Sequence, residues 1–135
     1  MEAQVNVAVQ IARQMVEFFR TGMAPNAVNL PPVAPEVFRK SRQFLELAEK
    51  IGKLQAQLSE GRLLRITVEY RGEVLEHPTS LLTAAVLKGA LEESAEVPLN
   101  LVNAPYIARE RGVQVEEVRY SEHSDYLNLI AVYYR

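Results

Sequence analysis

Four prolines stand at positions 25, 31, 32 and 35, and they constrain the fold of this chain more than any other feature. Proline has no backbone N–H and biases the residue before it towards extended conformations, so a regular helix cannot run through residues 23–35. The sequence therefore predicts a linker over 23–35. This linker divides the chain into a terminal unit, residues 1–22, and a larger unit, residues 36–135, and it is the natural hinge between them.

Helical patterns lie on both sides of this linker. Apolar residues recur at steps of three and four over residues 2–20, which predicts an amphipathic helix of about five turns that ends at Thr21-Gly22. We expect its apolar face to pack on its own domain, with part of that face made for a further domain. Pro35 in a first helical turn, and apolar residues seven apart from Val37 to Leu58, predict a second helix that ends near Gly61.

The rest of the chain alternates β and α patterns. Apolar–polar alternation from Leu63 to Tyr70 predicts a half-buried strand, with a kink at Arg71-Gly72 and a continuation over residues 73–76. The expected elements after it are a helix with Thr79 or Ser80 as N-cap that runs to about Glu93, a short extended run over 97–102, a short helix over 106–111, and strands over 113–120 and 126–134 joined by a hairpin turn at 121–125. The expected fold class is α+β, with one mixed or antiparallel sheet backed by helices.

Composition excludes several classes of function. Fifteen basic residues against 17 acidic ones give a net charge of −2, which is not the broad basic field of a nucleic-acid binder. The absence of cysteine excludes disulfides and thiolate-held metals or clusters. No apolar run is long enough for a membrane span, and the first residues lack the pattern of a signal peptide, so a cytoplasmic location without a membrane partner is expected.

Few residues point to catalysis. The glycines are scattered, so no phosphate-cradling loop is present, and His77 and His123 lack the spacing of metal ligands. From these residues we expect no catalytic, cofactor-binding or metal site in this chain. Arginine outnumbers lysine by 11 to 4, and arginine grips phosphate and carboxylate groups with two parallel hydrogen bonds. The candidate anion-binding residues are Arg109, Arg111 and Arg119, with Lys88 and Arg135 as possible neighbours, and a solvated face with weak surface ion pairs is the alternative.

Several stretches together resemble a known family, the long (type 1) D-3-phosphoglycerate dehydrogenases. Residues 25–31, Pro-Asn-Ala-Val-Asn-Leu-Pro, are similar to the linker of that family, and the helix before them resembles the one that closes its nucleotide-binding unit. The matches to its intervening domain are Leu47 to Gly52, Tyr70 to Glu73, Lys88-Gly89, Val102 to Pro105, Glu110 to Val113, Ser121-Glu122, Asp125-Tyr126 and Asn128-Leu129. The resemblance covers essentially the whole chain.

The resemblance implies a non-catalytic fragment of a larger enzyme. Residues 1–22 would be the terminal helix of the catalytic region, and residues 36–135 the intervening, or allosteric substrate-binding, domain. The parent would oxidise 3-phosphoglycerate with NAD in serine biosynthesis, as a homo-oligomer whose catalytic and regulatory (ACT) domains flank this one. In the family the domain binds phosphate or phosphorylated hydroxy acids in some members, and Arg119 matches a basic residue of that site.

Two other interpretations stay open. The chain is alternatively a structural spacer and oligomerisation domain with no ligand, which predicts an apolar patch on the first helix or at a sheet edge. Iron–sulfur serine dehydratases use a related domain, but the first helix and the linker argue against that family.

Overall fold

The computed structural model describes residues 2–21, 33–122 and 125–135. Within them the chain forms four α-helices and a three-stranded mixed sheet, which confirms the α+β class. The predicted linker falls mostly, and His123 wholly, outside the described residues. The elements are α1 (Glu2–Thr21), α2 (Pro35–Leu58), β1 (Arg65–Gly72), the 3₁₀ turn η1 (Glu73–Glu76), α3 (Thr79–Leu91), the 3₁₀ turn η2 (Glu92–Ser94), α4 (Ala104–Glu110), β2 (Gln114–Tyr120) and β3 (Asn128–Tyr134).

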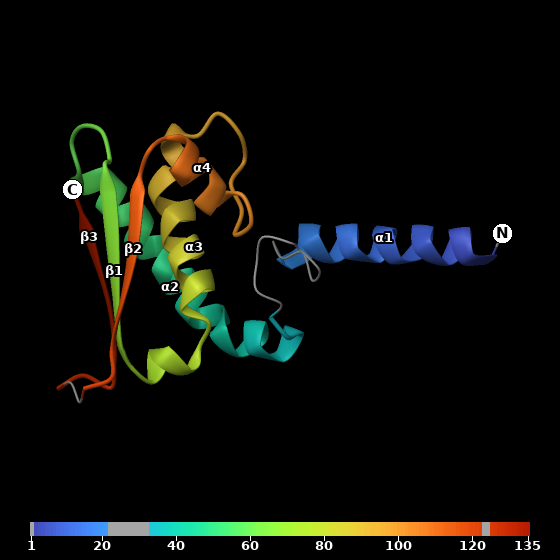
Figure 1. Ribbon diagram of the computed structural model, residues 1–135, viewed down its shortest axis with the longest axis horizontal. Helices are drawn as coiled ribbons and strands as arrows, with labels where there is room; N and C mark the ends of the chain where they lie inside the picture. The colour runs from blue at the N-terminus through green and yellow to red at the C-terminus, as the bar shows by residue number, and fades with distance from the viewer. Residues whose placement is uncertain (1, 22–32, 123–124) are drawn as a thin grey trace.

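One layer of helices covers one face of the sheet (Figure 1). The strand order is β2-β1-β3, with β2 parallel and β3 antiparallel to the central β1. The alternation in β1 sends Ile66, Val68 and Tyr70 into the core, as the sequence predicts. Helix α3 is apolar on all sides and is buried between the sheet, α2 and α4.

Two glycines let α2 and α3 cross at close range. A Cβ on Gly52 would collide with the carbonyl of Val86, and one on Gly89 would collide with the carbonyl of Glu49. Neither position tolerates a side chain without separating the helices. This crossing fixes α3 over the sheet and thereby places the first turn of α3 at one end of β1 and β2.

The hairpin prediction for residues 121–125 is wrong, because β2 and β3 lie on opposite sides of β1. Their connection passes over the end of β1 at Gly72, which has a φ of 85° and no room for a Cβ beneath the carbonyl of Leu127. The backbone N–H of Glu73 donates to that carbonyl at 3.1 Å. The predicted kink is therefore a crossing point that ends β1, and residues 73–76 form η1 instead of a continued strand.

Two further local predictions are wrong. The 97–102 segment is not a strand, because the Oδ1 atom of Asn100 accepts the N–H groups of Val102 and Asn103, each at 2.8 Å, and satisfies them locally. The N-cap of α3 is Pro78, not Thr79 or Ser80.

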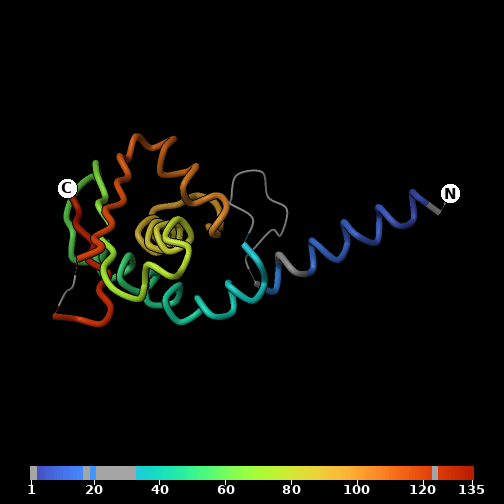
Figure 2. The backbone as a smooth tube through the Cα atoms, turned by 60° about the horizontal axis from the view of Figure 1, so that its bottom comes forward, coloured from blue at the N-terminus to red at the C-terminus, as the bar shows by residue number. Residues whose placement is uncertain are grey.

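Helix α1 differs from the other described helices in the exposure of its side chains. Its described side chains, residues 3–16 and 19–20, are exposed, and α1 extends away from the sheet-and-helix unit in two views (Figures 1 and 2). None of the described helices is long and apolar enough to cross a bilayer.

Candidate functional site

Arg119 lies near the carboxyl end of β2, where the parallel register pairs it with Tyr70 of β1. Its side chain consequently leaves the sheet on the helix-covered face, as the side chain of Tyr70 does. Because β2 is an edge strand, no neighbouring strand covers Arg119 within the described chain, and its side chain is 61% exposed. The arginine that the resemblance singles out is therefore accessible to a ligand.

A carboxylate of the protein itself lies beside Arg119. The Oε2 atom of Glu117 accepts a hydrogen bond from Nη2 of Arg119 at 3.2 Å and another from Oγ1 of Thr79 at 3.2 Å. Thr79 is the first residue of α3, whose N-cap offers no side-chain hydrogen bond. The positive end of the helix dipole therefore also faces this carboxylate. We call Thr79, Glu117 and Arg119 the β2 corner.

Tyr70 holds this corner against the core. Its hydroxyl donates to the carbonyl oxygen of Thr79 at 3.3 Å and lies 2.7 Å from Oγ1 of Thr83. Burial raises the pKa of Tyr70 well above its ordinary value, and the charge of Glu117 raises it further. Tyr70 therefore stays protonated and holds the first turn of α3 through these two contacts.

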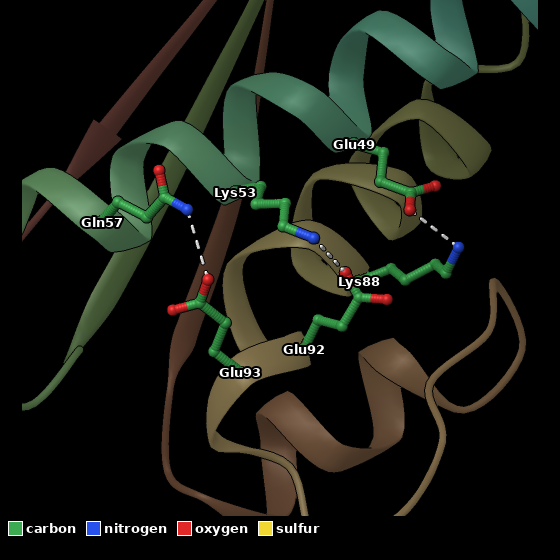
Figure 3. Close-up of polar contacts among 6 residues, drawn as sticks. All are labelled: Glu49, Lys53, Gln57, Lys88, Glu92 and Glu93. Atoms are coloured by element: carbon green, nitrogen blue, oxygen red, sulfur yellow. Dashed lines mark hydrogen bonds and ion pairs between the residues drawn. The ribbon is translucent and has the colours of Figure 1, made fainter.

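Lys88, another of the predicted anion-binding residues, lies outside the β2 corner and already forms an ion pair. Its Nζ atom is 2.9 Å from Oε1 of Glu49 on α2 (Figure 3). Further along α2, Lys53 pairs with Glu92 at 3.2 Å and Gln57 donates to Glu93 at 3.3 Å, and both glutamates lie in η2, directly after α3. These three contacts form a polar seam between α2 and the end of α3. The geometry of Lys88 is that of a helix-to-helix contact.

Arg111 and Arg135 line a cavity of about 720 Å³ at the opposite end of the sheet, together with Arg62. Two nitrogens of Arg111 donate to Oγ and to the carbonyl of Ser94, both at 2.6 Å, and Nη2 of Arg62 donates to the carbonyl of Arg111 at 3.1 Å. These carbonyls follow the ends of α3 and α4, where the helix dipoles are negative. Arg62 and Arg111 therefore satisfy helix ends, and that compensation weakens the cavity as an anion site.

The five predicted residues thus do not come together. Arg119 is in the β2 corner, Lys88 is in the polar seam, Arg111 and Arg135 line the distal cavity, and Arg109 is exposed in the last turn of α4. At about 3.3 Å per residue, β2 separates Arg119 from the distal cavity by roughly 20 Å.

Sequence reasoning missed Thr79 and Glu117 as companions of Arg119. Glu117 could have been predicted as a neighbour of Arg119, since residues two apart on a strand share a face. No sequence pattern places Thr79 near Arg119, because the approach of Thr79 to β2 depends on the crossing of α2 and α3.

His77 has a structural environment. Its Nδ1 atom is 2.8 Å from Oγ of Ser41, which donates to the carbonyl of Val37 at 2.7 Å, and its ring lies 4.6 Å from that of Phe44. Ser41 is fully buried, so its hydroxyl is not exposed to a substrate, whereas His77 is half-buried. Within the described residues, no group of three or more potential ligands gathers around a metal position.

Comparisons with known proteins agree on one family. The family model described as the D-3-phosphoglycerate dehydrogenase intervening domain matches residues 40–135. A D-3-phosphoglycerate dehydrogenase of Synechocystis is 41% identical over 126 residues, which are 93% of this chain and 23% of the relative. One of Bacillus subtilis is 34% identical over 97% of this chain and 25% of its own, and D-3-phosphoglycerate dehydrogenase 3, chloroplastic, of Arabidopsis thaliana is 38% identical over 88% and 21%. The chain spans between a fifth and a quarter of the length of these relatives.

Proposed function

The chain belongs to the D-3-phosphoglycerate dehydrogenase family as its intervening domain, and on that premise we propose that it is a non-catalytic module that binds a small anion at the β2 corner. The ligand class is a phosphate or a phosphorylated hydroxy acid such as 3-phosphoglycerate. The catalytic and regulatory domains of an NAD-dependent parent enzyme would be its neighbours.

The observation that carries this proposal is the carboxylate of Glu117, held at once by Arg119, by Thr79 and by the first turn of α3. An external anion with the same oxygen chemistry competes with Glu117 for these donors. Displacement of Glu117 would free its side chain and alter the edge of the sheet. The anion then favours one arrangement of the flanking domains by the difference in its affinity for the two arrangements.

The affinity of this corner is expected to be low. One exposed arginine, one hydroxyl and one helix end support a dissociation constant on the order of 1 mM, about 4 kcal/mol. The test is an NMR titration of the labelled 135-residue chain with 3-phosphoglycerate at low ionic strength. Saturable shifts should centre on Thr79, Glu117 and Arg119, and inorganic phosphate should compete.

Three variants separate this site from the distal cavity. Arg119→Ala should abolish the saturable shifts, whereas Arg62→Ala should leave them unchanged. Glu117→Gln should tighten binding several-fold, because it removes the competing negative charge. Shifts that follow Arg62 and Arg135 instead, or no shifts at tens of millimolar ligand, would refute anion binding at the β2 corner.

A second candidate function, an oligomerisation domain, is favoured by a different observation. The other edge of the sheet, β3, contains no charged residue in its seven positions.

A further inference from the structure

The distal cavity has the size and the lining of a small-molecule site. Its volume of about 720 Å³ lies within the range of roughly 300–1,000 Å³ that is typical of ligand pockets. It opens where the ends of α2, α3 and β3 meet the turn after α4. The anion site proposed at the β2 corner lies at the other end of the sheet and does not use this cavity.

The floor of the cavity is apolar. Leu91 and Val113 are 4% and 7% exposed, so they belong both to the core and to the floor. The hydroxyl of Tyr134 donates to the carbonyl oxygen of Gly52 at 3.0 Å, which holds the tyrosine ring in the cavity wall. Three more side chains complete this surface: Ala56, Leu63 and Ala90. An apolar group of a ligand is stabilised by burial against such a surface.

The rim of the cavity is basic. Arg62, Arg111 and Arg135 line it, and within the described residues none of the three forms an ion pair. Two carboxylates, those of Glu60 and Glu93, line the same cavity. Three positive and two negative side chains leave a net charge of +1, which suits a ligand with a single negative charge.

Arg135 has both a fixed backbone and an unengaged side chain. Its N–H donates to the carbonyl oxygen of Arg65 at 2.9 Å, and its own carbonyl oxygen accepts from Leu64 at 2.8 Å and from Arg65 at 2.9 Å. Its exposed guanidinium group has no hydrogen-bond partner in the part of the chain that the structure describes. All N–H donors of this group are therefore available to a carboxylate.

Arg111 and Arg62 build the rim. Arg111 donates twice to Ser94, and Arg62 donates once, through Nη2, to the carbonyl oxygen of Arg111. The same Nη2 lies over Gly112, 4.0 Å from the position that a Cβ would take there. These contacts join the segment before β1 to the ends of α3 and α4, so the rim is formed before a ligand arrives. Arg62 keeps its other N–H donors for the ligand.

We propose that the distal cavity binds an amphipathic monocarboxylate, a molecule with one carboxylate group on an apolar or aromatic body. The carboxylate accepts two parallel hydrogen bonds from Arg135, and Arg62 contributes a further donor. The body of the ligand lies on the floor, against Leu63 and the ring of Tyr134.

Two observations select this class of ligand. A bare anion is weakly held, because Arg111 and one N–H of Arg62 are engaged at helix ends, and an apolar body adds the missing affinity through burial. A dianion, such as a phosphate ester, is repelled by Glu60 and Glu93 on the same rim. The cavity thus differs in ligand class from the β2 corner.

A titration of the labelled 135-residue chain with 4-phenylbutyrate at pH 7, followed by NMR, tests the proposal. Saturable shifts should centre on Leu63, Leu91 and Arg135. Two analogues separate the parts of the ligand, since 4-phenylbutanol lacks the carboxylate and butyrate lacks the ring. Each analogue should bind about tenfold more weakly, or worse, than 4-phenylbutyrate. Equal affinity for the alcohol and the acid would refute recognition of the carboxylate.

Three variants locate the site. Arg135→Gln should weaken 4-phenylbutyrate about tenfold and leave 4-phenylbutanol unaffected, because it removes only the partner of the carboxylate. Arg39→Gln, the same change on an exposed arginine in the first half of α2, is the matched control and should alter neither affinity. Ala56→Phe fills the cavity from α2 and should abolish binding of both compounds, with circular dichroism to verify that the variant is folded.

The β2 corner provides an independent comparison. Arg119→Ala should leave the titration with 4-phenylbutyrate unchanged, and 3-phosphoglycerate should not compete, so this proposal and the anion site stand or fall separately. Three results would overturn the proposal: no saturable shifts at tens of millimolar 4-phenylbutyrate, shifts centred on the exposed apolar face of α1, or binding that is insensitive to Arg135→Gln.

Discussion

Helices α1 and α3 are both rich in apolar residues, yet their surroundings are opposite. Eleven of the thirteen residues of α3 are buried. The described side chains of α1, residues 3–16 and 19–20, are all exposed, with Ile11 at 51% and Val5 at 61%. A surface helix carries one apolar stripe, whereas a helix that is apolar all round belongs inside a core. The comparison shows that apolar residues in a helix do not by themselves determine whether that helix is buried.

The total exposed surface measures how much of this chain is open. It is 9538 Å², whereas a compact monomer of 15.2 kDa exposes about 7,100 Å². The excess is consistent with the exposure of α1. Substitutions that behave differently in α1 and α3 test this division directly.

The largest difference is expected from cavity-forming substitutions. Leu87→Ala, at a position 1% exposed in α3, should lower the free energy of unfolding by about 3 kcal/mol, because the lost side chain leaves a cavity. Ile11→Ala on α1 should change it by less than about 0.5 kcal/mol. Urea denaturation followed by circular dichroism measures both. Equal losses in the two variants would mean that α1 is packed on the rest of the chain.

A smaller difference is expected when a single carbon is added. Gly89→Ala should destabilise the fold by about 2 kcal/mol, because the new Cβ meets the backbone of Glu49 and the two helices must separate. Val7→Ile, which also adds one carbon but on exposed α1, is the matched control and should be neutral. If Gly89→Ala were neutral too, the close crossing of α2 and α3 would not exist as described.

How much of this could be predicted from the sequence depended on the range of the interactions. Periodicity located α1, α2, β1, α3, α4, β2 and β3, because each pattern reports local geometry. It failed where a distant residue decides the conformation. Gly72 turns the chain beneath Leu127, more than fifty positions later, and the expected hairpin is replaced by a crossing.

The candidate site shows the same limit. Arg119 was predicted as a site residue, but its companion Thr79 belongs to another element that only the helix crossing brings near. Arg111 and Arg119 are close in sequence, yet a strand that runs straight carries them to opposite ends of the sheet. Clusters of charge in a sequence therefore locate single residues better than they assemble sites.

Alkaline pH is expected to lower the stability of the unit that contains buried Tyr70. Helix α1 contains no tyrosine and should not show this effect. At pH 7 Tyr70→Phe should cost about 1 kcal/mol, because it removes the hydroxyl bonded to Thr79 and Thr83. Since the pKa of Tyr70 is raised in the folded state, its contribution is present below pH 10 and is lost as the pH rises further. The stability gap between wild type and Tyr70→Phe should therefore narrow above pH 10. Urea midpoints measured at pH 7, 9 and 10.5 would show it, and a constant gap would contradict it.

The smallest effect is expected at the polar seam. Lys88 and Glu49 are both partly exposed, so their ion pair should contribute no more than about 1 kcal/mol. A double-mutant cycle with Lys88→Met and Glu49→Gln should give a coupling of about 0.5 kcal/mol that shrinks as salt is added, because exposed charges are screened. The glycine crossing beside it is expected to be insensitive to salt. A coupling above 2 kcal/mol, or one independent of salt, would mean that this seam, and not the crossing at Gly89, holds α3 against α2.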